Sequence, residues 1–202
     1  MTVQVPRTAA LLLAAGQSRR HPGQSKLSRR LDDQPMGIHA ARAIAALAPA
    51  VRIAVVSEAT CDLAPALEDL GFETAWNDDP GRGLASSIAI GVRAALDHQV
   101  EAVLVCLADM PFVSAAHLRA LLARVDGAGG VTMVGSRPAG SETIMPPAVF
   151  AGEAIGRLLE LEGDRGAGAL LRHGPAVEAS PEELLDLDDP AAFDAVESAR
   201  KT

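Results

Sequence analysis

Short apolar runs alternate along the chain with longer segments in which apolar residues recur at helical spacing. The apolar runs predict four β-strands, at residues 9–13, 52–56, 102–107 and 131–134. The periodic segments predict four helices, at residues 36–48, 60–70, 84–97 and 114–124, the last with Ser114 as its N-cap. Strands that alternate with helices are typical of a parallel sheet with helices on both faces. The pattern therefore predicts a three-layer, Rossmann-like α/β fold with a mostly parallel sheet.

The stretch from residue 135 to residue 147, "GSRPAGSETIMPP", is rich in Gly, Pro and Ser. We interpret it as a long loop that separates the sheet-forming part from a helical C-terminal third. Because the sequence shows no internal repeat and no interdomain linker, residues 1–202 are predicted to form a single domain. In such a domain ligands bind beyond the carboxyl ends of the strands, so the loops after Leu13, Val56 and Leu107 are the places where chemistry is expected.

The composition narrows the classes of partner. Hydrophobic residues make up 49% of the 202 residues but aromatic residues only 2%, and the net charge is -8. An acidic chain with so few rings to stack on bases is not expected to bind nucleic acid. No apolar run is long enough for a membrane span and no signal peptide is evident, so we expect a cytoplasmic protein without a membrane partner. Cys61 and Cys106 lack metal-binding spacing and are expected to be free thiols.

One basic segment stands out against this acidic background. Residues 1–31 contain six Arg and Lys residues and no Asp or Glu. Within this segment, small residues at 14–16 follow the first strand, and their backbone N–H groups can form a concave anion site. Arg20 and Lys26 add cations beside it, and Lys26 is one of only two lysines in the chain. The use of a lysine at this position favours a compact point charge that binds a phosphate. A basic loop exposed to solvent is the alternative.

Four motifs occur in an order that resembles a known family. They are "LAAGQSRRHPGQSKL", "NDDPGRGLASSIAIGVRAA", "LADMP" and "LEGDRGAGALL", and they extend over nearly the whole chain. The set resembles the nucleotidyltransferases related to molybdenum cofactor cytidylyltransferase, whose signature is LAAG-x-S-x-R, a short glycine-containing spacer and then Lys. Gly16, Ser18, Arg20 and Lys26 fall on the matching positions. The resemblance implies the fold of the nucleotide-diphospho-sugar transferases.

The resemblance also implies an activity and the residues that carry it. A Mg²⁺-dependent enzyme of this family would transfer CMP from CTP to the molybdenum-molybdopterin cofactor and release pyrophosphate. Because both reactants are anions, catalysis would consist mainly of charge neutralisation and alignment. Arg20 would hold the β- and γ-phosphates and Lys26 the α-phosphate. The nucleotide-binding residues implied in the loops are Ala14, Ala15, Gly16, Ser18, Asn77, Gly83, Ser86 and Ser87.

Asp109 is the first candidate for a metal ligand. It directly follows the apolar run "AVLVCL", which places its carboxylate at the carboxyl edge of the sheet, where a hard oxygen ligand suits Mg²⁺. An Asp that starts a turn before Met110 and Pro111 is the alternative. The resemblance implies a second ligand late in the chain, for which Asp164 in "GDRGAG" is the candidate. A simple Gly-Asp turn is the alternative for Asp164.

Two departures from the family pattern concern the acceptor. The stretch "SETIMPPAVF" has neither the Arg nor the His of the family's Arg-Gly-His-Pro element, and Gly168 replaces the Arg of GD-x-GAR. On the nucleotide side, the guanylyl branch of the family tends to carry LAGG where this chain has LAAG, so the resemblance favours cytidine over guanosine. Two alternative functions stay open: an NAD(P)H-dependent oxidoreductase similar to nicotine blue oxidoreductase, and a non-catalytic chaperone that passes the cofactor to a molybdoenzyme partner.

Overall fold

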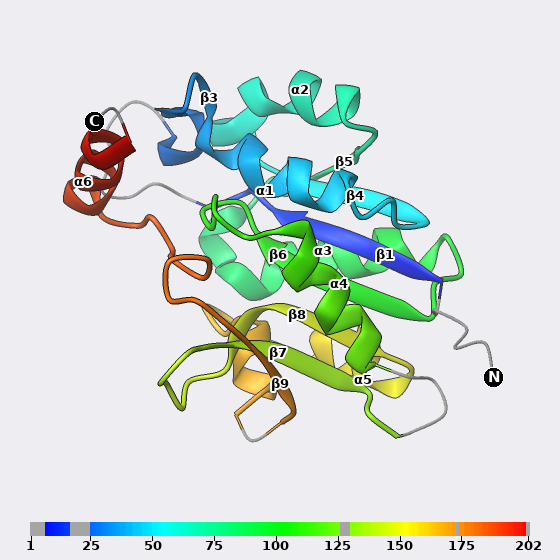
Figure 1. Ribbon diagram of the computed structural model, residues 1–202. Coiled ribbons are helices and arrows are strands. Elements are labelled where there is room, and N and C mark those ends of the chain that lie inside the picture. Colours follow the sequence, from blue (N-terminus) through cyan, green and yellow to red (C-terminus); the bar gives the residue numbers. More distant parts are fainter. Residues whose placement is uncertain (1–6, 17–24, 126–129, 173, 201–202) are drawn as a thin grey trace.

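A seven-stranded β-sheet forms the centre of the computed structural model (Figure 1). The structure describes residues 7–16, 25–125, 130–172 and 174–200. The strand order is β5-β4-β1-β6-β8-β7-β9, and β8 runs antiparallel to both of its neighbours while the other pairings are parallel. The strands are β1 (Thr8–Leu13), β4 (Val51–Val56), β5 (Glu73–Trp76), β6 (Ala102–Leu107), β7 (Met133–Pro138), β8 (Met145–Ala151) and β9 (Ala176–Ala179). A separate ribbon pairs β2 (Arg30–Leu31) with β3 (Gln34–Pro35).

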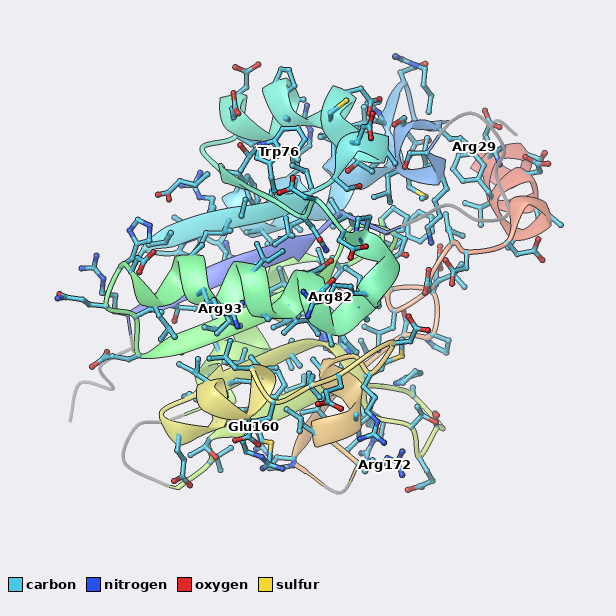
Figure 2. The ribbon with its side chains drawn as sticks, turned by 180° about the vertical axis from the view of Figure 1, so that it is seen from behind. Arg29, Trp76, Arg82, Arg93, Glu160 and Arg172 are labelled. Carbon is cyan, nitrogen blue, oxygen red and sulfur yellow. The ribbon has the colours of Figure 1, made fainter. Side chains whose placement is uncertain are left out.

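Helices cover both faces of this sheet. The α-helices are α1 (Met36–Ala45), α2 (Ala64–Asp69), α3 (Leu84–Leu96), α4 (Ala115–Arg124), α5 (Glu153–Leu158) and α6 (Pro190–Arg200). The 3-10 helices are η1 (Lys26–Ser28), η2 (Glu58–Leu63), η3 (Pro80–Arg82) and η4 (Ala167–Leu170). One hydrophobic cluster joins the sheet to α1, α2 and α4, and a second joins its other face to α3 and α5. Figure 2 views the second face, with α3 and its Arg93 in front of the sheet. The predicted three-layer α/β fold is confirmed.

Strand β1 explains why the central strands are apolar on both sides. Ala10 and Leu12 belong to the cluster on the α1 face, whereas Leu11 and Leu13 belong to the cluster on the α3 face. Because successive side chains of a strand point to opposite faces, a strand covered on both faces needs an uninterrupted apolar run. The runs of β1, β4 and β6 were therefore visible in the sequence, and the structure places these three strands side by side.

The helix predicted at residues 114–124 is confirmed, with Ser114 as its N-cap. The Ser114 Oγ accepts a hydrogen bond from the backbone N–H of His117 at 3.1 Å, which satisfies one of the free donors at the helix start. His117 is buried, and its Nε2 lies 2.7 Å from Ser136 Oγ, whose hydroxyl donates to the carbonyl oxygen of Pro147. The Nε2 must therefore carry the proton. Burial lowers the pKa of His117, although the nearby carboxylate of Glu183 opposes this shift.

The prediction of a long loop at residues 135–147 was wrong. Strand β7 continues to Pro138 and strand β8 begins at Met145, so the connection between them is short. The register of β7 against β8 shifts between Gly135 and Ser136. The two prolines of "IMPP" fall at this irregularity, where the ladder of hydrogen bonds is interrupted and a missing N–H costs little. Local composition alone did not reveal that the two segments pair.

The predicted helical C-terminal third was also only partly right. That part of the chain does contain α5, η4 and α6, but it also supplies strands β8 and β9 to the sheet. Strand β5, "ETAW", was missed as well because it is short and lies at the edge of the sheet, where its residues are only partly buried. An edge strand needs no continuous apolar run, so it gives a weak signal in the sequence.

After β9 the chain crosses the carboxyl edge of the sheet and ends in α6, beside η1 and the β2–β3 ribbon (Figure 1). We call residues 180–189 the C-terminal strap. The backbone N–H of Leu187 in the strap donates to the carbonyl oxygen of Asp109 at 3.0 Å. In α6, Asp194 pairs with Arg29 at 2.7 Å and the Phe193 ring lies 3.9 Å below the Arg29 guanidinium. The acidic C-terminal segment thus meets part of the basic N-terminal segment.

Within the described ranges, the structure has no helix that is both long enough and apolar enough to cross a membrane.

Candidate active site

The carboxyl ends of β1 and β6 and the N-terminus of α3 meet at one edge of the sheet. Ala14 and Ala15 follow β1 and are buried, whereas Gly16 is exposed. The backbone N–H of Ala14 donates to the carbonyl oxygen of Val55 at 2.8 Å and so continues the ladder of the sheet. That N–H is therefore not free to bind a phosphate, which corrects the expectation for this atom. Ser18 and Arg20 lie outside the described residues, and their roles stay predictions.

Lys26 lies at the centre of a cluster of carboxylates. Its Nζ donates to Asp109 Oδ2 at 2.6 Å, although the two residues are 83 positions apart in the sequence. The same Nζ donates to Asp188 Oδ1 and lies 3.9 Å from Asp186 Oδ1. The Lys26 side chain is only 11% exposed. The contact brings together two residues that the sequence assigned to one site, and their catalytic roles stay predictions.

Asp186 and Asp188, both in the C-terminal strap, join Asp109 to form a possible cation site. One carboxylate oxygen from each residue lies within 4.8 Å of the others. Oδ1 of Asp109 and Oδ1 of Asp186 are buried and accept no hydrogen bond from the described part of the chain. Oxygen ligands that converge in this way, with unused lone pairs, match what a hard divalent cation requires.

Sequence reasoning missed Asp186 and Asp188. A usable signal was the alternation in "LLDLDDP", because an extended segment with this pattern places its aspartates on one side and its leucines on the other. Leu187 is indeed buried between them. Asp164, the candidate that the sequence suggested, is exposed and is not part of this cluster. It lies instead in the loop that contacts Gly83.

The cluster contains more acidic than basic side chains. Burial raises the pKa of Asp186 to about 7, and the charges of Asp109 and Asp188 add to this shift while Lys26 opposes it. Burial alone would lower the pKa of Lys26, but its contacts with Asp109, Asp188 and Asp186 outweigh burial and raise the pKa overall. One ammonium group therefore faces three carboxylates, and a further cation would relieve their repulsion.

A dependence of stability on pH follows from Asp186. Its pKa is about 7 in the folded protein against the ordinary value of 3.8 for an aspartate, so the folded state holds the extra proton between these values. Without divalent cations, the free energy of unfolding contributed by this group therefore falls as the pH rises through this window. We expect the wild-type Tm to fall between about pH 5 and about pH 7, and Asp186→Asn to reduce that fall. Asp164→Asn, a change at an exposed carboxylate, should keep the wild-type pH profile; equal profiles for all three proteins would contradict the assignment.

Four predicted nucleotide-binding residues lie together at the start of α3. Asn77 is 3% exposed, and its Nδ2 donates to Ser86 Oγ at 3.0 Å and to Ser87 Oγ at 2.9 Å. The Ser86 hydroxyl donates to the carbonyl oxygen of Gly83 at 2.8 Å. The structure thus brings Asn77, Gly83, Ser86 and Ser87 into one hydrogen-bonded group, and whether they bind a nucleotide stays a prediction.

Gly83 is required by a close approach of two segments. The backbone N–H of Ala85 in α3 donates to the carbonyl oxygen of Gly163 at 3.0 Å. A Cβ on Gly83 would overlap the Gly163 carbonyl group and come within 2.8 Å of the Asp164 nitrogen, and the φ of Gly83 is +92°. Both observations exclude a side chain at this position. The "GDRGAG" motif therefore supports the N-terminus of α3.

We expect Gly83→Ala to lower the free energy of unfolding by about 2 kcal/mol or more, because the methyl group meets backbone atoms and the positive φ disfavours Ala. Urea unfolding monitored by circular dichroism measures the change. Gly156→Ala is the matched control: it lies in α5, where a Cβ meets nothing within 4 Å, so this change should be neutral or stabilising. Equal stability of Gly83→Ala and the wild type would show that the two segments separate easily.

The two positions at which the chain departs from the family pattern lie close together in the structure. Gly168 in η4 lies beside the start of β8, and a Cβ on it would be 3.8 Å from both the Ile144 carbonyl oxygen and Pro146 Cδ. Met145, between these two residues, packs against a small cluster that contains Met110, next to Asp109. Both departures therefore change one surface next to Asp109, where the chain carries apolar side chains and a glycine.

Comparison with known proteins defines the class. The model of the MobA-like NTP transferase domain matches residues 10–179. The chain is 31% identical over 211 residues to the "Purine catabolism protein PucB" of Bacillus subtilis (strain 168), covering 96% of this chain and 98% of PucB. It is 34% identical over 141 residues to a "Probable molybdenum cofactor guanylyltransferase" of Haloferax mediterranei, covering 68% of this chain and 62% of that protein.

A solved structure shows the same fold. Rv0371c from Mycobacterium tuberculosis H37Rv superposes with a TM-score of 0.80 at 20% identity, over 95% of this chain and 98% of that one. A second structure of that protein, at a TM-score of 0.70 and 18% identity over 96% and 99% of the two chains, is a complex with manganese. The chain belongs to the MobA-like NTP transferase family. It is therefore a member of a nucleotidyltransferase family, as the sequence motifs predicted.

Proposed function

We propose that this protein is a Mg²⁺-dependent nucleotidyltransferase that transfers CMP from CTP to a phosphorylated acceptor, with the molybdenum-molybdopterin cofactor as the leading candidate. The observation that carries the proposal is the convergence of Lys26 with Asp109, Asp186 and Asp188 at the carboxyl edge of the sheet. A cation and a group of converging carboxylates beside a nucleotide loop are the elements that phosphoryl chemistry needs. Membership in an NTP transferase family supports the same conclusion.

Asp109, Asp186 and Asp188 would hold Mg²⁺, which supplies charge neutralisation at the phosphates when it is bound. The donor set fits such an ion because it consists of carboxylate oxygens, two of which are buried without a hydrogen bond from the described residues. The complex of Rv0371c with manganese shows a divalent cation on a protein of this fold. Asp164 stays a prediction as a ligand and is the weaker candidate because it is exposed.

In the proposed reaction an oxygen of the acceptor's phosphate attacks the α-phosphorus of the nucleoside triphosphate. The bond between the α-phosphorus and the oxygen bridging to the β-phosphate breaks, and pyrophosphate leaves with the electron pair. Lys26 would move its ammonium group from the carboxylates to the α-phosphate, where negative charge develops, and Arg20 would bind the leaving phosphates. Nothing covalent is required of the protein, so alignment and charge carry the rate.

The identity of the base is decided by experiment. The LAAG sequence favours CTP, whereas the Haloferax relative carries the name of a guanylyltransferase. Incubating the purified protein with Mg²⁺, molybdopterin and each of the four nucleoside triphosphates, and measuring pyrophosphate release, tests both choices. Pyrophosphate from CTP supports the proposal and pyrophosphate from GTP corrects the base. Release from none, together with oxidation of NADPH by a dye acceptor, would favour the oxidoreductase alternative.

The acceptor surface gives a separate prediction. A Cβ at Gly168 would meet its neighbours at 3.8 Å, an ordinary contact, so a side chain can begin there without a clash at Cβ. If molybdopterin is the acceptor, we expect Gly168→Arg to raise the rate of CMP transfer by about tenfold, the effect of one charge-assisted hydrogen bond. Gly156→Arg in α5 adds the same charge at an exposed position and should leave the rate unchanged. A fast wild type that Gly168→Arg slows would mean that other cations, such as Arg165 or Arg172, replace the lost one.

A further inference from the structure

The side-chain amide of Asn77 has only one possible orientation. Asn77 Oδ1 lies 3.1 Å from the backbone N–H of Asp79, which can only donate a hydrogen bond. The atom that faces Asp79 must therefore be the oxygen, and the amide nitrogen must face the two serine hydroxyls. Since Nδ2 donates to both Ser86 Oγ and Ser87 Oγ, each hydroxyl oxygen acts as an acceptor toward Asn77. Each serine then keeps its own proton for another partner.

The two serines use that proton differently. The Ser86 hydroxyl donates its proton to the carbonyl oxygen of Gly83 at 2.8 Å. For the Ser87 hydroxyl, which is only 5% exposed, no acceptor is found among the described residues. A buried hydroxyl whose oxygen is fixed as an acceptor and whose proton is unused is prepared to donate to a ligand.

The direction in which Ser87 points follows from Gly91, one helical turn further along α3. A Cβ on Gly91 would lie 2.9 Å from Val55 Cγ2 and 3.2 Å from Leu11 Cδ1, so this side of α3 faces the sheet. Residues four apart lie on the same side of a helix and about 6 Å apart along its axis. Because α3 starts at the carboxyl edge, Ser87 lies about 6 Å nearer that edge than Gly91, at the level where β1 ends and the loop of residues 14–16 begins.

Ser86 points elsewhere. Together with Trp76 and Ile90 it lines a cavity of about 670 Å³ on the outer side of α3. Figure 2 shows Trp76 at the edge of the sheet and Arg93 on the outer side of α3, two of the residues that line this cavity. Of the two serines that Asn77 contacts, Ser87 therefore lies on the side of α3 that faces the sheet, near the level of residues 14–16, whereas Ser86 lies at the cavity.

We propose that Asn77 is a positioning residue that does not touch the nucleotide but presents the Ser87 hydroxyl as a hydrogen-bond donor to an acceptor atom of the bound base or ribose. This inference rests on the proposed function. It revises the role of Asn77, which the sequence placed among the residues that contact the nucleotide. It also makes Ser86, whose proton is used within α3, a structural residue.

A double-mutant cycle on nucleotide binding tests the inference. The dissociation constants of CTP and GTP with Mg²⁺ are measured by calorimetry for the wild type, Ser87→Ala, Asn77→Asp and the double variant. Asp has the shape of Asn but only accepts hydrogen bonds, so it would take the Ser87 proton. We expect Ser87→Ala to weaken binding by about five- to tenfold in the wild-type background and to have almost no effect in the Asn77→Asp background. The negative charge that Asn77→Asp adds is present in both members of that second pair and cancels.

Ser86→Ala is the comparison variant, because Ser86 accepts from the same amide group but donates its own proton to the carbonyl oxygen of Gly83. It should therefore weaken binding clearly less than Ser87→Ala does. The thermal midpoint of each variant is measured alongside, and the fluorescence of Trp76, the single tryptophan of the chain, gives a second signal next to Asn77.

Three results would overturn the inference. If the effect of Ser87→Ala is the same in both backgrounds, Asn77 does not act through Ser87, and the proposed function stands without it. If Ser86→Ala weakens binding as much as Ser87→Ala, the assignment of the donor is wrong, again without harm to the proposed function. If the wild type binds neither nucleotide with Mg²⁺, the proposed function fails and the inference fails with it.

Discussion

Replacing Asp109 by Asn will lower the rate of Mg²⁺-dependent nucleotidyl transfer by at least about a hundredfold, because a ligand that neutralises phosphate charge contributes several kcal/mol to the transition state. The fold should survive. Lys26 keeps its contacts with Asp186 and Asp188, and the amide of Asn is nearly the same size as the carboxylate that it replaces. The rate is measured as pyrophosphate release, and the binding of Mn²⁺ to the protein is measured by paramagnetic resonance as a readout that does not need the acceptor.

Asp186→Asn and Asp164→Asn complete this comparison. Asp186 belongs to the carboxylate cluster, whereas Asp164 is exposed and outside it. We therefore expect Asp186→Asn to weaken Mn²⁺ binding and Asp164→Asn to leave it unchanged. The reverse pattern would show that the ion lies near "GDRGAG", as the sequence suggested, and that the cluster around Lys26 has another purpose.

Replacing Lys26 by Met will change catalysis and metal binding in opposite directions. Transfer should slow by about a hundredfold or more, because the charge that develops on the α-phosphate loses its nearest cation. Mg²⁺ should nevertheless bind the nucleotide-free protein more tightly than it binds the wild type, because Lys26 no longer competes for Asp109, Asp186 and Asp188. Met fills a similar volume, so the change mainly removes charge.

The thermal midpoint of unfolding distinguishes competition between Lys26 and Mg²⁺ from a simple loss of stability. Without divalent cations, Lys26→Met leaves three neighbouring carboxylates without their shared cation and should lower the midpoint. Adding Mg²⁺ should restore more of the midpoint in the variant than it adds to the wild type. Lys26→Arg keeps the charge but not the compact shape, so it should show wild-type stability with a reduced rate. A variant that loses stability and gains nothing from Mg²⁺ would argue against a metal at these carboxylates.

The candidate site contains residues from both ends of the chain. The N-terminal segment is basic and the C-terminal strap with α6 is acidic, and the structure joins them through Lys26 with Asp188 and Arg29 with Asp194. In the sequence the positive charge of residues 1–31 suggested only an anionic ligand or solvent. Part of that charge instead pairs with the chain's own carboxylates, and Lys26 is the member of these pairs that lies at the candidate active site.

The sequence by itself determined the elements whose physics is local. Strands β1, β4 and β6 are buried on both faces and need continuous apolar runs, and α3 and α4 show helical periodicity with Ser114 as a cap. The ordered motifs also identified the family and pointed to Lys26 and Asp109. Only the tertiary structure decided which carboxylates accompany them, because Asp186 and Asp188 reach Asp109 through the path that the chain takes after β9. Strand β9, the pairing of β7 with β8 and the approach of Gly163 to Gly83 likewise depend on contacts between segments distant in the sequence, which no local pattern encodes.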